Sequence, residues 1–242
     1  MLTKPIYIIS DLHLGDGHPE LLEAFERFID IKARHAHALY ILGDLFEAWV
    51  GDDDDSATAR RVSERLKGLS EQGVPVFYMH GNRDFLVGKS FLNQSDMHLL
   101  PDPSVVTFDG HDVLMSHGDL LCTHDAPYQR YRWLVHRPWI QWLFLALPRA
   151  WRHKVGDKLR MQSQAQGTHK QMSLMDVNEE TVAQWLKHYQ VYTLVHGHTH
   201  KPFKHFYPMC HPPFTRFVLG AWDNGQAKIL CYQRGELALV DL

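Results

Sequence analysis

The stretch Tyr40-Ile41-Leu42-Gly43-Asp44-Leu45-Phe46-Glu47 places an acidic residue where an apolar strand ends and a glycine turns the chain. A carboxylate in this place faces whatever ligand binds at the edge of a sheet. Four further clusters also follow short apolar runs, and this repeated context predicts that all of them form one site. They are Asp11-Leu12-His13, Gly81-Asn82-Arg83-Asp84, Ser116-His117-Gly118-Asp119 and His196-Gly197-His198-Thr199-His200.

Apolar runs at 5–10, 38–42 and 74–80 alternate with helical spacing after Pro19 and around Val62. This order predicts a mostly parallel α/β sheet with ligands at the strand ends. Further on, 104–108 and 112–116 flank the turn Asp109-Gly110 as a hairpin, and Asn178 caps a helix that precedes a strand at 192–195. Strands are also expected at 215–219, 227–232 and 236–240. Parallel order in the first half and antiparallel order in the second predict two facing sheets.

The composition describes an ordinary globular chain of 242 residues, with 45% hydrophobic and 22% charged residues and a net charge of -3. It argues against a broadly cationic nucleic-acid binder, and no nucleic-acid partner is expected. The three cysteines lack metal-site spacing and fit reduced thiols in a cytoplasmic protein. The N-terminus lacks a signal-peptide pattern, so export is not expected. We expect one domain, 1–242, with a helical insertion at about 125–175.

The insertion combines an apolar, tryptophan-rich segment with a basic one. The run from Trp139 to Leu147 is too short to span a bilayer, which needs about 20 residues. Two interpretations stay open: a helical hairpin packed on the core, or a cap that handles lipid or contacts a membrane surface. The four acids from Asp52 to Asp55 favour a solvated loop over an extra cation site, because like charges repel without a metal.

The strand-end clusters supply carboxylate, amide and imidazole groups, a mixed oxygen and nitrogen set that suits Mn, Fe or Zn better than Ca or Mg. Two metals fit this set better than one, because a carboxylate such as Asp44 can bridge two ions and leave positions open for substrate. Such a pair stabilises the attacking and leaving oxygens at phosphorus. The expected reaction is hydrolysis of a phosphoester or a phosphoanhydride.

In order along the chain, Asp-x-His, Gly-Asp, Gly-Asn-x-Asp, His and Gly-His-x-His resemble the motifs of the calcineurin-like metallophosphoesterases. The resemblance implies two facing mixed sheets flanked by helices, and two metal sites that share Asp44. The first site takes Asp11, His13, Asp44 and His200, and the second takes Asp44, Asn82, His117 and His198. His196 has no role in this scheme beyond that of a strand-end residue or a hydrogen-bonding neighbour of the ligands.

Arg83 departs from the broad superfamily, in which many members have a histidine after the Gly-Asn pair. Arginine does not donate a proton usefully at neutral pH, but it binds phosphate oxygens with two hydrogen bonds. Loss of the acid is tolerable when the leaving group is itself a phosphate monoester, with a second pKa of about 6. Arg83 therefore points to a phosphoanhydride substrate, and Asp44, Asn82, Arg83 and His117 are the predicted catalytic residues.

A narrower resemblance, spread over nearly the whole chain, is to the UDP-2,3-diacylglucosamine pyrophosphatases of lipid A biosynthesis. It rests on Ser10 to Leu14, Tyr40 to Gly51, His80 to Leu86, Leu143 to Pro148 and Met175 to Asn178, together with the histidine clusters. It implies water attack on the α-phosphorus, release of UMP and 2,3-diacylglucosamine 1-phosphate (lipid X), and two Mn²⁺ ions. It also implies a monomer on the inner face of the inner membrane, with the insertion as an acyl-chain cap.

The same resemblance assigns the substrate contacts, and one of them departs from the family pattern. Gly167 stands where the family commonly has an asparagine, which puts one contact to the glucosamine in doubt. The contacts are Asn82, Arg83, Asp125, Ser163, Gly167, Lys170 and His198. Two alternatives remain: a soluble dinuclear-metal phosphodiesterase or nuclease of the same fold, and a non-catalytic scaffold that binds a partner through its apolar patch.

Overall fold

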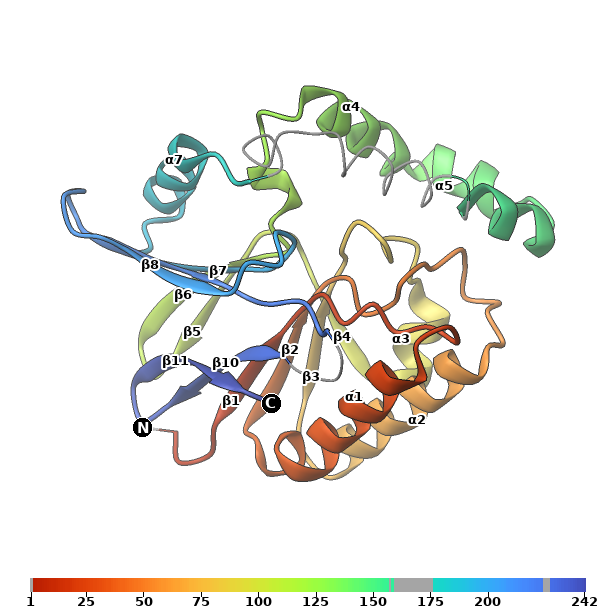
Figure 1. Ribbon diagram of the computed structural model, residues 1–242, viewed down its shortest axis with the longest axis horizontal. Coiled ribbons are helices and arrows are strands. Elements are labelled where there is room, and N and C mark those ends of the chain that lie inside the picture. The colour runs from red at the N-terminus through yellow and green to blue at the C-terminus, as the bar shows by residue number, and fades with distance from the viewer. Residues whose placement is uncertain (1, 157, 159–175, 224–226) are drawn as a thin grey trace.

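Two facing mixed β-sheets with helices on their outer faces form the body of the protein (Figure 1), as the sequence predicts. The computed structural model describes residues 2–156, 158, 176–223 and 227–242. The six-stranded sheet has the order β11-β10-β1-β2-β3-β4. Its strands are β11 (Glu236–Asp241), β10 (Lys228–Gln233), β1 (Ile6–Ile9), β2 (Ala38–Leu42), β3 (Val76–Met79) and β4 (Met97–Leu100).

The five-stranded sheet has the order β5-β6-β7-β9-β8. Its strands are β5 (Ser104–Phe108), β6 (His111–Ser116), β7 (Thr193–His196), β9 (Phe214–Val218) and β8 (Phe203–Tyr207). The expected antiparallel order of the second half holds for β5–β6, β8–β9 and β10–β11, but β6 pairs with β7 and β7 with β9 in parallel. The last two strands return to the first sheet, where β10 runs antiparallel to β1.

Helices cover the outer face of each sheet. α1 (Pro19–Ile31), α2 (Ala57–Glu71) and α3 (Lys89–Ser95) lie against the six-stranded sheet, and α7 (Glu179–Tyr189) lies against the other. Their apolar stripes explain this packing: Phe25 and Phe28 of α1 join Val62 of α2 in one core cluster. Asn178 caps α7 as predicted, accepting hydrogen bonds from the backbone N–H groups of Glu180 and Thr181.

The space between the sheets is filled by side chains that alternate along the strands. Ile8 and Tyr40 from the first sheet meet Met115 and Phe217 from the second in one buried cluster. Residues of β2 alternate between this cluster and the helical side, where Leu39 and Ile41 pack. Both faces of the strands that end at the candidate site are therefore buried, which holds those ends rigidly.

α4 (Ala126–Val135), α5 (Pro138–Leu145) and a helical segment at 149–156 arch over the strand ends (Figure 1). We call these three segments the cap. α4 and α5 contain no buried residue, so the expectation of a hairpin packed on the core does not hold for them. Among the described residues, no helix has both the length and the apolar character to cross a membrane.

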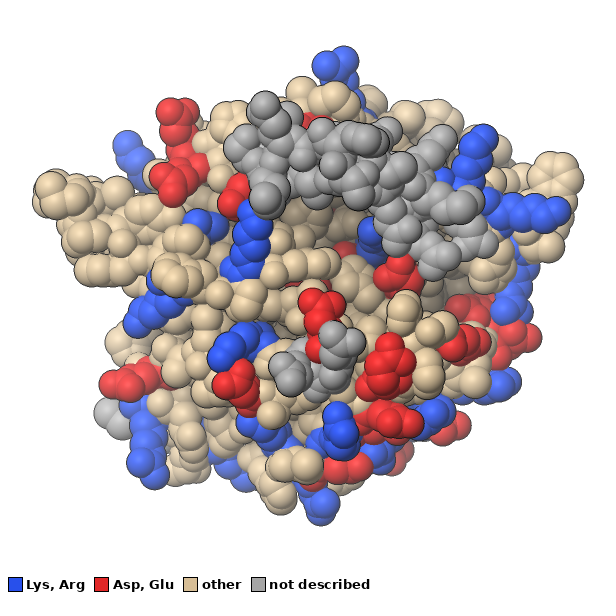
Figure 2. Space-filling model, in the orientation of Figure 1, with Lys and Arg blue, Asp and Glu red and all other residues tan. Residues whose placement is uncertain are grey.

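The acidic loop 52–55 is more than the solvated loop that was expected, because it anchors the cap and α3. Arg152 is buried and pairs with Asp53, and Arg149 Nη2 lies 2.6 Å from Asp55 Oδ1. Asp52 accepts hydrogen bonds from backbone N–H groups at the start of α3. Lys and Arg side chains gather above Asp and Glu side chains at the right-hand end of the arch (Figure 2).

Candidate metal centre

The predicted ligands meet at one place, because the strands that precede them end at the same edge of the two sheets. β1, β2 and β3 run parallel in one sheet, and β6 and β7 run parallel in the other. Each ligand segment begins within three residues of its strand end. We call the ligand set of Asp11, His13, Asp44, Asn82, His117, His198 and His200 the ligand cluster.

Sharp backbone turns direct these side chains inward. A positive φ is uncommon outside glycine and costs about 1–3 kcal/mol where a non-glycine residue is held in a sparsely populated region. It nevertheless occurs at most positions of the ligand cluster, namely Asp11 (55°), His13 (50°), Asp44 (51°), His198 (68°) and His200 (56°). Such concentrated backbone strain is typical of a functional site.

The first part of the cluster brings a carboxylate and two imidazoles together. His200 Nε2 lies 3.4 Å from Asp11 Oδ1 and 3.3 Å from His13 Nε2. His13 Nε2 is also 3.9 Å from Asp44 Oδ2. Asp11, His13 and His200 therefore form a group whose ligand atoms are close enough to bind one ion.

The second part is organised around the amide of Asn82. Its Oδ1 lies 3.0 Å from His117 Nε2 and 2.9 Å from His198 Nδ1. His117 Nε2 is 3.8 Å from Asp44 Oδ1, while its Nδ1 donates a hydrogen bond to the carbonyl of Leu42 at 2.9 Å. This outer hydrogen bond fixes the ring so that Nε2 faces the cluster. Asp44 thus lies between the two parts.

The charges of the cluster fit a bound cation. Burial raises the pKa of Asp44 to about 7, because a charge is costly in this interior. Burial alone would lower the pKa of His117, but the charges of Asp44 and Asp119 raise it to about 9. Burial lowers the pKa of His13 to about 3 and that of His198 to about 4. The neutral imidazoles of His13 and His198 beside buried carboxylates suit a divalent metal, and the raised pKa of His117 shows that its position favours a positive charge.

Asp84 holds the backbone of the site, a role that the sequence analysis did not assign. Its carboxylate is fully buried and accepts hydrogen bonds from Leu45 N at 2.7 Å and Gly81 N at 2.8 Å. It also accepts one from Asp44 N at 3.2 Å. The carboxylate in Gly-Asn-x-Asp was the available signal. Asp84 therefore fixes the turns that carry Asp44 and Asn82.

Arg83 lies at the cluster with its side chain available. Its backbone N–H donates to Asp44 Oδ1 at 2.8 Å, which ties the two residues together. Within the described part of the chain, no hydrogen bond or ion pair involves its guanidinium group. Burial lowers the pKa of His13 and raises that of Tyr131, and the charge of Arg83 is a smaller influence on both, which places Arg83 near the cluster and near α4.

The other predicted substrate contacts are only partly placed by the structure. Asp125 is half-buried and caps α4, where its Oδ1 accepts a hydrogen bond from Tyr128 N at 3.2 Å. Ser163, Gly167 and Lys170 lie outside the described residues.

A polar network that the sequence did not reveal ties the cap to the site. Asp119 Oδ2 accepts hydrogen bonds from Arg132 Nε at 2.6 Å and from the Tyr128 hydroxyl at 2.7 Å. The Tyr128 ring stacks near that of His198, with 6.2 Å between centroids. α4 is therefore anchored two residues beyond the predicted ligand His117.

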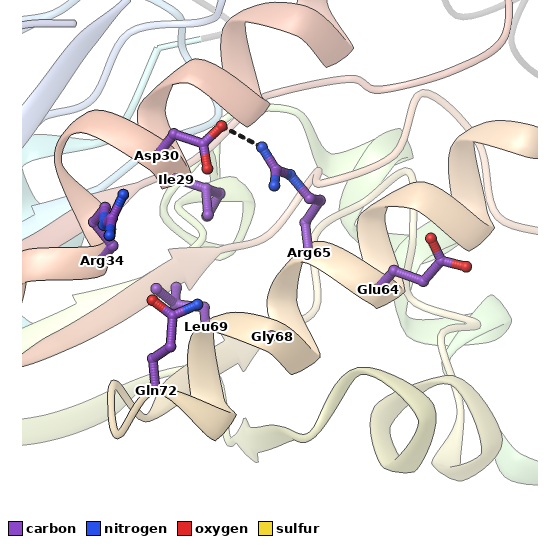
Figure 3. Close-up of a pocket in the computed structure, with 8 residues that line it drawn as sticks. All are labelled: Ile29, Asp30, Arg34, Glu64, Arg65, Gly68, Leu69 and Gln72. Carbon is purple, nitrogen blue, oxygen red and sulfur yellow. Dashed lines mark hydrogen bonds and ion pairs between the residues drawn. The ribbon is translucent and has the colours of Figure 1, made fainter.

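A separate cavity of about 170 Å³ between α1 and α2 contains none of the predicted site residues (Figure 3). Arg65 spans it and pairs with Asp30, while Leu69 forms part of its floor. An interhelical salt bridge of this kind accounts for the polar lining, so the cavity adds nothing to the candidate site.

Residues 4–202 match the sequence model of the calcineurin-like phosphoesterase family. The fold agrees: an archaeal phosphodiesterase structure has a TM-score of 0.50 at 13% identity, covering 98% of this chain and 99% of that one. A cold-active protein tyrosine phosphatase structure also has a TM-score of 0.50, at 16% identity, covering 98% of this chain and 78% of its own. The chain belongs to the calcineurin-like phosphoesterases.

Closer relatives carry a more specific name. UDP-2,3-diacylglucosamine hydrolase of Histophilus somni (strain 129Pt) is 48% identical over 219 residues, which cover 90% of this chain and 92% of the relative. The protein of that name from Salmonella paratyphi C (strain RKS4594) is 48% identical over 216 residues, or 89% and 90% of the two chains. Within its class, the chain belongs to this family of UDP-2,3-diacylglucosamine hydrolases.

Proposed function

We propose that this protein hydrolyses the pyrophosphate bond of UDP-2,3-diacylglucosamine in lipid A biosynthesis. Water attacks the α-phosphorus, and the products are UMP and 2,3-diacylglucosamine 1-phosphate (lipid X). The observation that carries the proposal is the convergence of the complete ligand cluster at one strand edge, in a chain whose relatives bear this name. The enzyme is a metal-dependent hydrolase of a single domain, with a helical insertion at about 125–175.

The residues of the ligand cluster form two metal sites. Asp11, His13, Asp44 and His200 hold one divalent ion, and Asp44, Asn82, His117 and His198 hold a second. When bound, two such ions acidify water and neutralise charge on the phosphoryl oxygens. We propose Mn²⁺ for both positions. Asp44 acts on both sites because its two oxygens face His13 and His117.

Arg83 binds the phosphoryl oxygens and balances the charge that develops on them. Its backbone is fixed by Asp44, and its guanidinium has no carboxylate partner among the described residues, so it is available to an anionic substrate. Arginine cannot serve as a general acid at neutral pH. The leaving group must therefore depart without protonation, which suits a phosphate and not an alkoxide.

Substrate positioning extends from the cluster into the insertion. Asn82, Arg83 and His198 contact the phosphates, and Asp125 and Ser163 contact hydroxyl or amide groups of the substrate. Gly167 is the remaining predicted position, where this chain lacks the asparagine side chain of the family. Lys170 supplies a second positive charge for a phosphate. Asp125 supports this arrangement because it is the N-cap residue of α4, the first helix of the cap.

The cap supports contact with a lipid surface. Trp139, Trp142 and Trp151 are 59%, 69% and 65% exposed, which is unusual for side chains of this size. Arg137 lies over Trp133 at 3.8 Å, which places a cation beside the exposed rings. Aromatic and basic side chains together are typical of an interfacial helix. We propose a cytoplasmic monomer that binds peripherally to the inner face of the inner membrane.

The decisive test is UMP release from UDP-2,3-diacylglucosamine in detergent micelles, with Mn²⁺ and after chelation, beside UDP-N-acetylglucosamine without acyl chains. Mn²⁺-dependent turnover of the acylated substrate alone supports both the reaction and the cap. Equal turnover of both substrates keeps the reaction and refutes the lipid cap. No turnover of either refutes the proposal and favours a phosphodiesterase acting on another substrate.

Membrane contact is tested separately by flotation with vesicles that contain anionic lipid. Trp139→Ser combined with Trp142→Ser should reduce the bound fraction, because burial of an indole ring in the interface is lost. Phe203→Ser is the matched control, since Phe203 is also 59% exposed but lies on β8, away from the cap. Equal binding of the wild type, the double tryptophan variant and Phe203→Ser would refute the proposed membrane-contacting surface.

A further inference from the structure

His196 is a buried histidine that the proposed metal sites do not use. It is the last residue of β7, is fully buried, and belongs to neither group of candidate ligands found among the described residues. Its Nδ1 lies 2.9 Å from the carbonyl oxygen of Gly197, and its Nε2 lies 3.3 Å from Arg216 Nη1. Both ring nitrogens therefore have a specific partner.

Arg216 and the Gly197 carbonyl together determine which ring nitrogen carries the proton. A guanidinium group only donates hydrogen bonds, so Nε2 of His196 must accept. The proton then resides on Nδ1, which donates to the Gly197 carbonyl. Arg216 is itself buried, and its Nη2 donates to the Tyr207 hydroxyl at 3.2 Å.

The Gly197 carbonyl belongs to a peptide group whose other side contacts a proposed ligand. The N–H of this group, on His198, donates to Asp11 Oδ2 at 2.9 Å. The carbonyl also accepts from Thr199 N at 2.8 Å. His196 and Asp11 thus hold one peptide plane from opposite sides. If the plane flipped, the carbonyl would face the Asp11 carboxylate and an attractive contact would become a repulsive one.

The same peptide orients the Asp11 carboxylate. Oδ2 accepts from Ser10 Oγ at 2.5 Å and from His198 N at 2.9 Å. Oδ1 is held by the same N–H at the longer distance of 3.2 Å and lies 3.4 Å from His200 Nε2. The backbone of Gly197 packs so closely on Asp11 and Ser10 that a Cβ atom there would clash with both. A change in the orientation of the Gly197–His198 peptide would therefore move an Asp11 oxygen and the His198 ring together.

We propose that His196, held in its Nδ1–H tautomer by Arg216, is a positioning residue for the metal centre. It acts through the Gly197–His198 peptide on Asp11 and His198 and does not contact metal or substrate. The inference rests on the proposed function only in taking Asp11 and His198 as metal ligands. Loss of an outer hydrogen bond of this kind typically costs about 10- to 100-fold in metal affinity or activity.

Two substitutions separate positioning from simple core packing. In His196→Asn the amide nitrogen takes the place of Nδ1 and can still donate to Gly197, whereas in His196→Gln the amide lies nearer the place of Nε2. We expect His196→Gln to bind Mn²⁺ about 10- to 100-fold more weakly and to lose kcat with little change in KM, and His196→Asn to be largely rescued. Mn²⁺ affinity is measured by equilibrium dialysis without substrate. Equal loss in both variants would overturn the proposal.

Nitrogen NMR of the imidazole rings tests the tautomer directly in the Zn²⁺-loaded, diamagnetic protein. The His196 signal, identified by its absence in His196→Asn, should show protonation at Nδ1. In Arg216→Met, which retains an unbranched stem, only the Gly197 carbonyl still favours the Nδ1–H form, so the population of that tautomer and the Mn²⁺ affinity should both fall. A wild-type ring protonated at Nε2 would refute the proposal. Because neither readout requires UMP release, the inference and the proposed function can fail independently.

Discussion

The ligand cluster and the cap are held in opposite ways. In the cluster, Asp11, Asp44 and His117 are at most 1% exposed and are fixed by backbone turns that end buried strands. In the cap, α4 and α5 have no buried residues and depend on polar contacts, notably those of Arg132 and Arg152. The ligand cluster is therefore held rigidly by the buried strands, whereas the cap is attached to the sheets by a few polar contacts. Substitutions in the two regions should therefore fail in different ways.

The largest effect is expected from Asp44→Ala in the ligand cluster. Because Asp44 faces both parts of the cluster, its loss should lower turnover by about 1,000-fold or more and release metal from both sites. Arg83→Ala should retain metal and slow turnover by about 100- to 1,000-fold, since only charge stabilisation is lost. Metal content by mass spectrometry, measured beside turnover, distinguishes the two. Comparable metal loss in both variants would contradict the assigned roles.

The next effect concerns Asp84, which fixes the cluster without belonging to it. In Asp84→Asn an amide NH₂ faces backbone N–H groups, so a buried donor loses its acceptor, which costs about 1–3 kcal/mol of unfolding free energy. We expect lower stability in urea together with weaker metal binding. Asp52→Asn is the control, because Asp52 also accepts three backbone N–H groups but at the start of α3. It should lose stability and keep metal affinity.

The difference between cluster and cap also explains what the sequence could predict. Every predicted ligand follows a short apolar run, and local patterns of glycine and acid mark the strand end. The sequence could therefore predict that Asp44 and His117 lie close together, as they do at 3.8 Å. Asp84 was missed because its role depends on hydrogen bonds to residues about 40 positions earlier. The Arg132–Asp119 and Arg152–Asp53 contacts likewise join segments whose local sequences carry no sign of each other.

The sequence analysis did not predict β4 and β8, and it could not predict which distant strands pair. β4 and β8 are edge strands with several exposed residues, so they lack a continuous buried run or a clear alternation. The return of β10 to β1 joins residues more than 220 positions apart, which no local periodicity encodes. The starts of α1 and α7 were predicted, because Pro19 and Asn178 act through local backbone geometry.

A smaller and local effect is expected when the cap anchor is removed. Arg152 donates to the carbonyl oxygens of Val50 and Leu147 and pairs with Asp53, so Arg152→Met leaves buried acceptors unpaired at a cost of about 1–3 kcal/mol. Hydrogen exchange should accelerate over α5 and 149–156 while the sheets stay protected. Metal content should not change. Arg149→Met, at a more exposed pair with Asp55, should show a weaker effect. Uniform acceleration throughout the chain would mean that the cap is part of the core.

The smallest effect on turnover is expected from Asp102, which lies where the network of Arg132 meets the sheet. Its Oδ1 accepts from Ser116 Oγ at 2.7 Å, and Arg132 Nη2 is 3.8 Å from its Oδ2. Burial, and then the charge of Asp119, raise the pKa of Asp102 to about 6, although Ser116, His117 and Arg132 oppose the shift. The folded state therefore holds a proton that the unfolded chain releases near its ordinary pKa of about 4.

The sign of the pH dependence follows from this raised pKa. Stability from protonated Asp102 is fully present below about pH 4 and is lost as pH rises through about 6. Asp102→Asn keeps an acceptor for Ser116 but cannot ionise, so the variant should gain stability relative to the parent across that interval. Urea unfolding of both proteins at several pH values measures this difference, in which all other titrating groups cancel. If the two stability curves stay parallel, the Asp102 carboxyl has an ordinary pKa. The contact of Asp102 with Ser116 and Arg132 would then not disfavour the charged carboxylate.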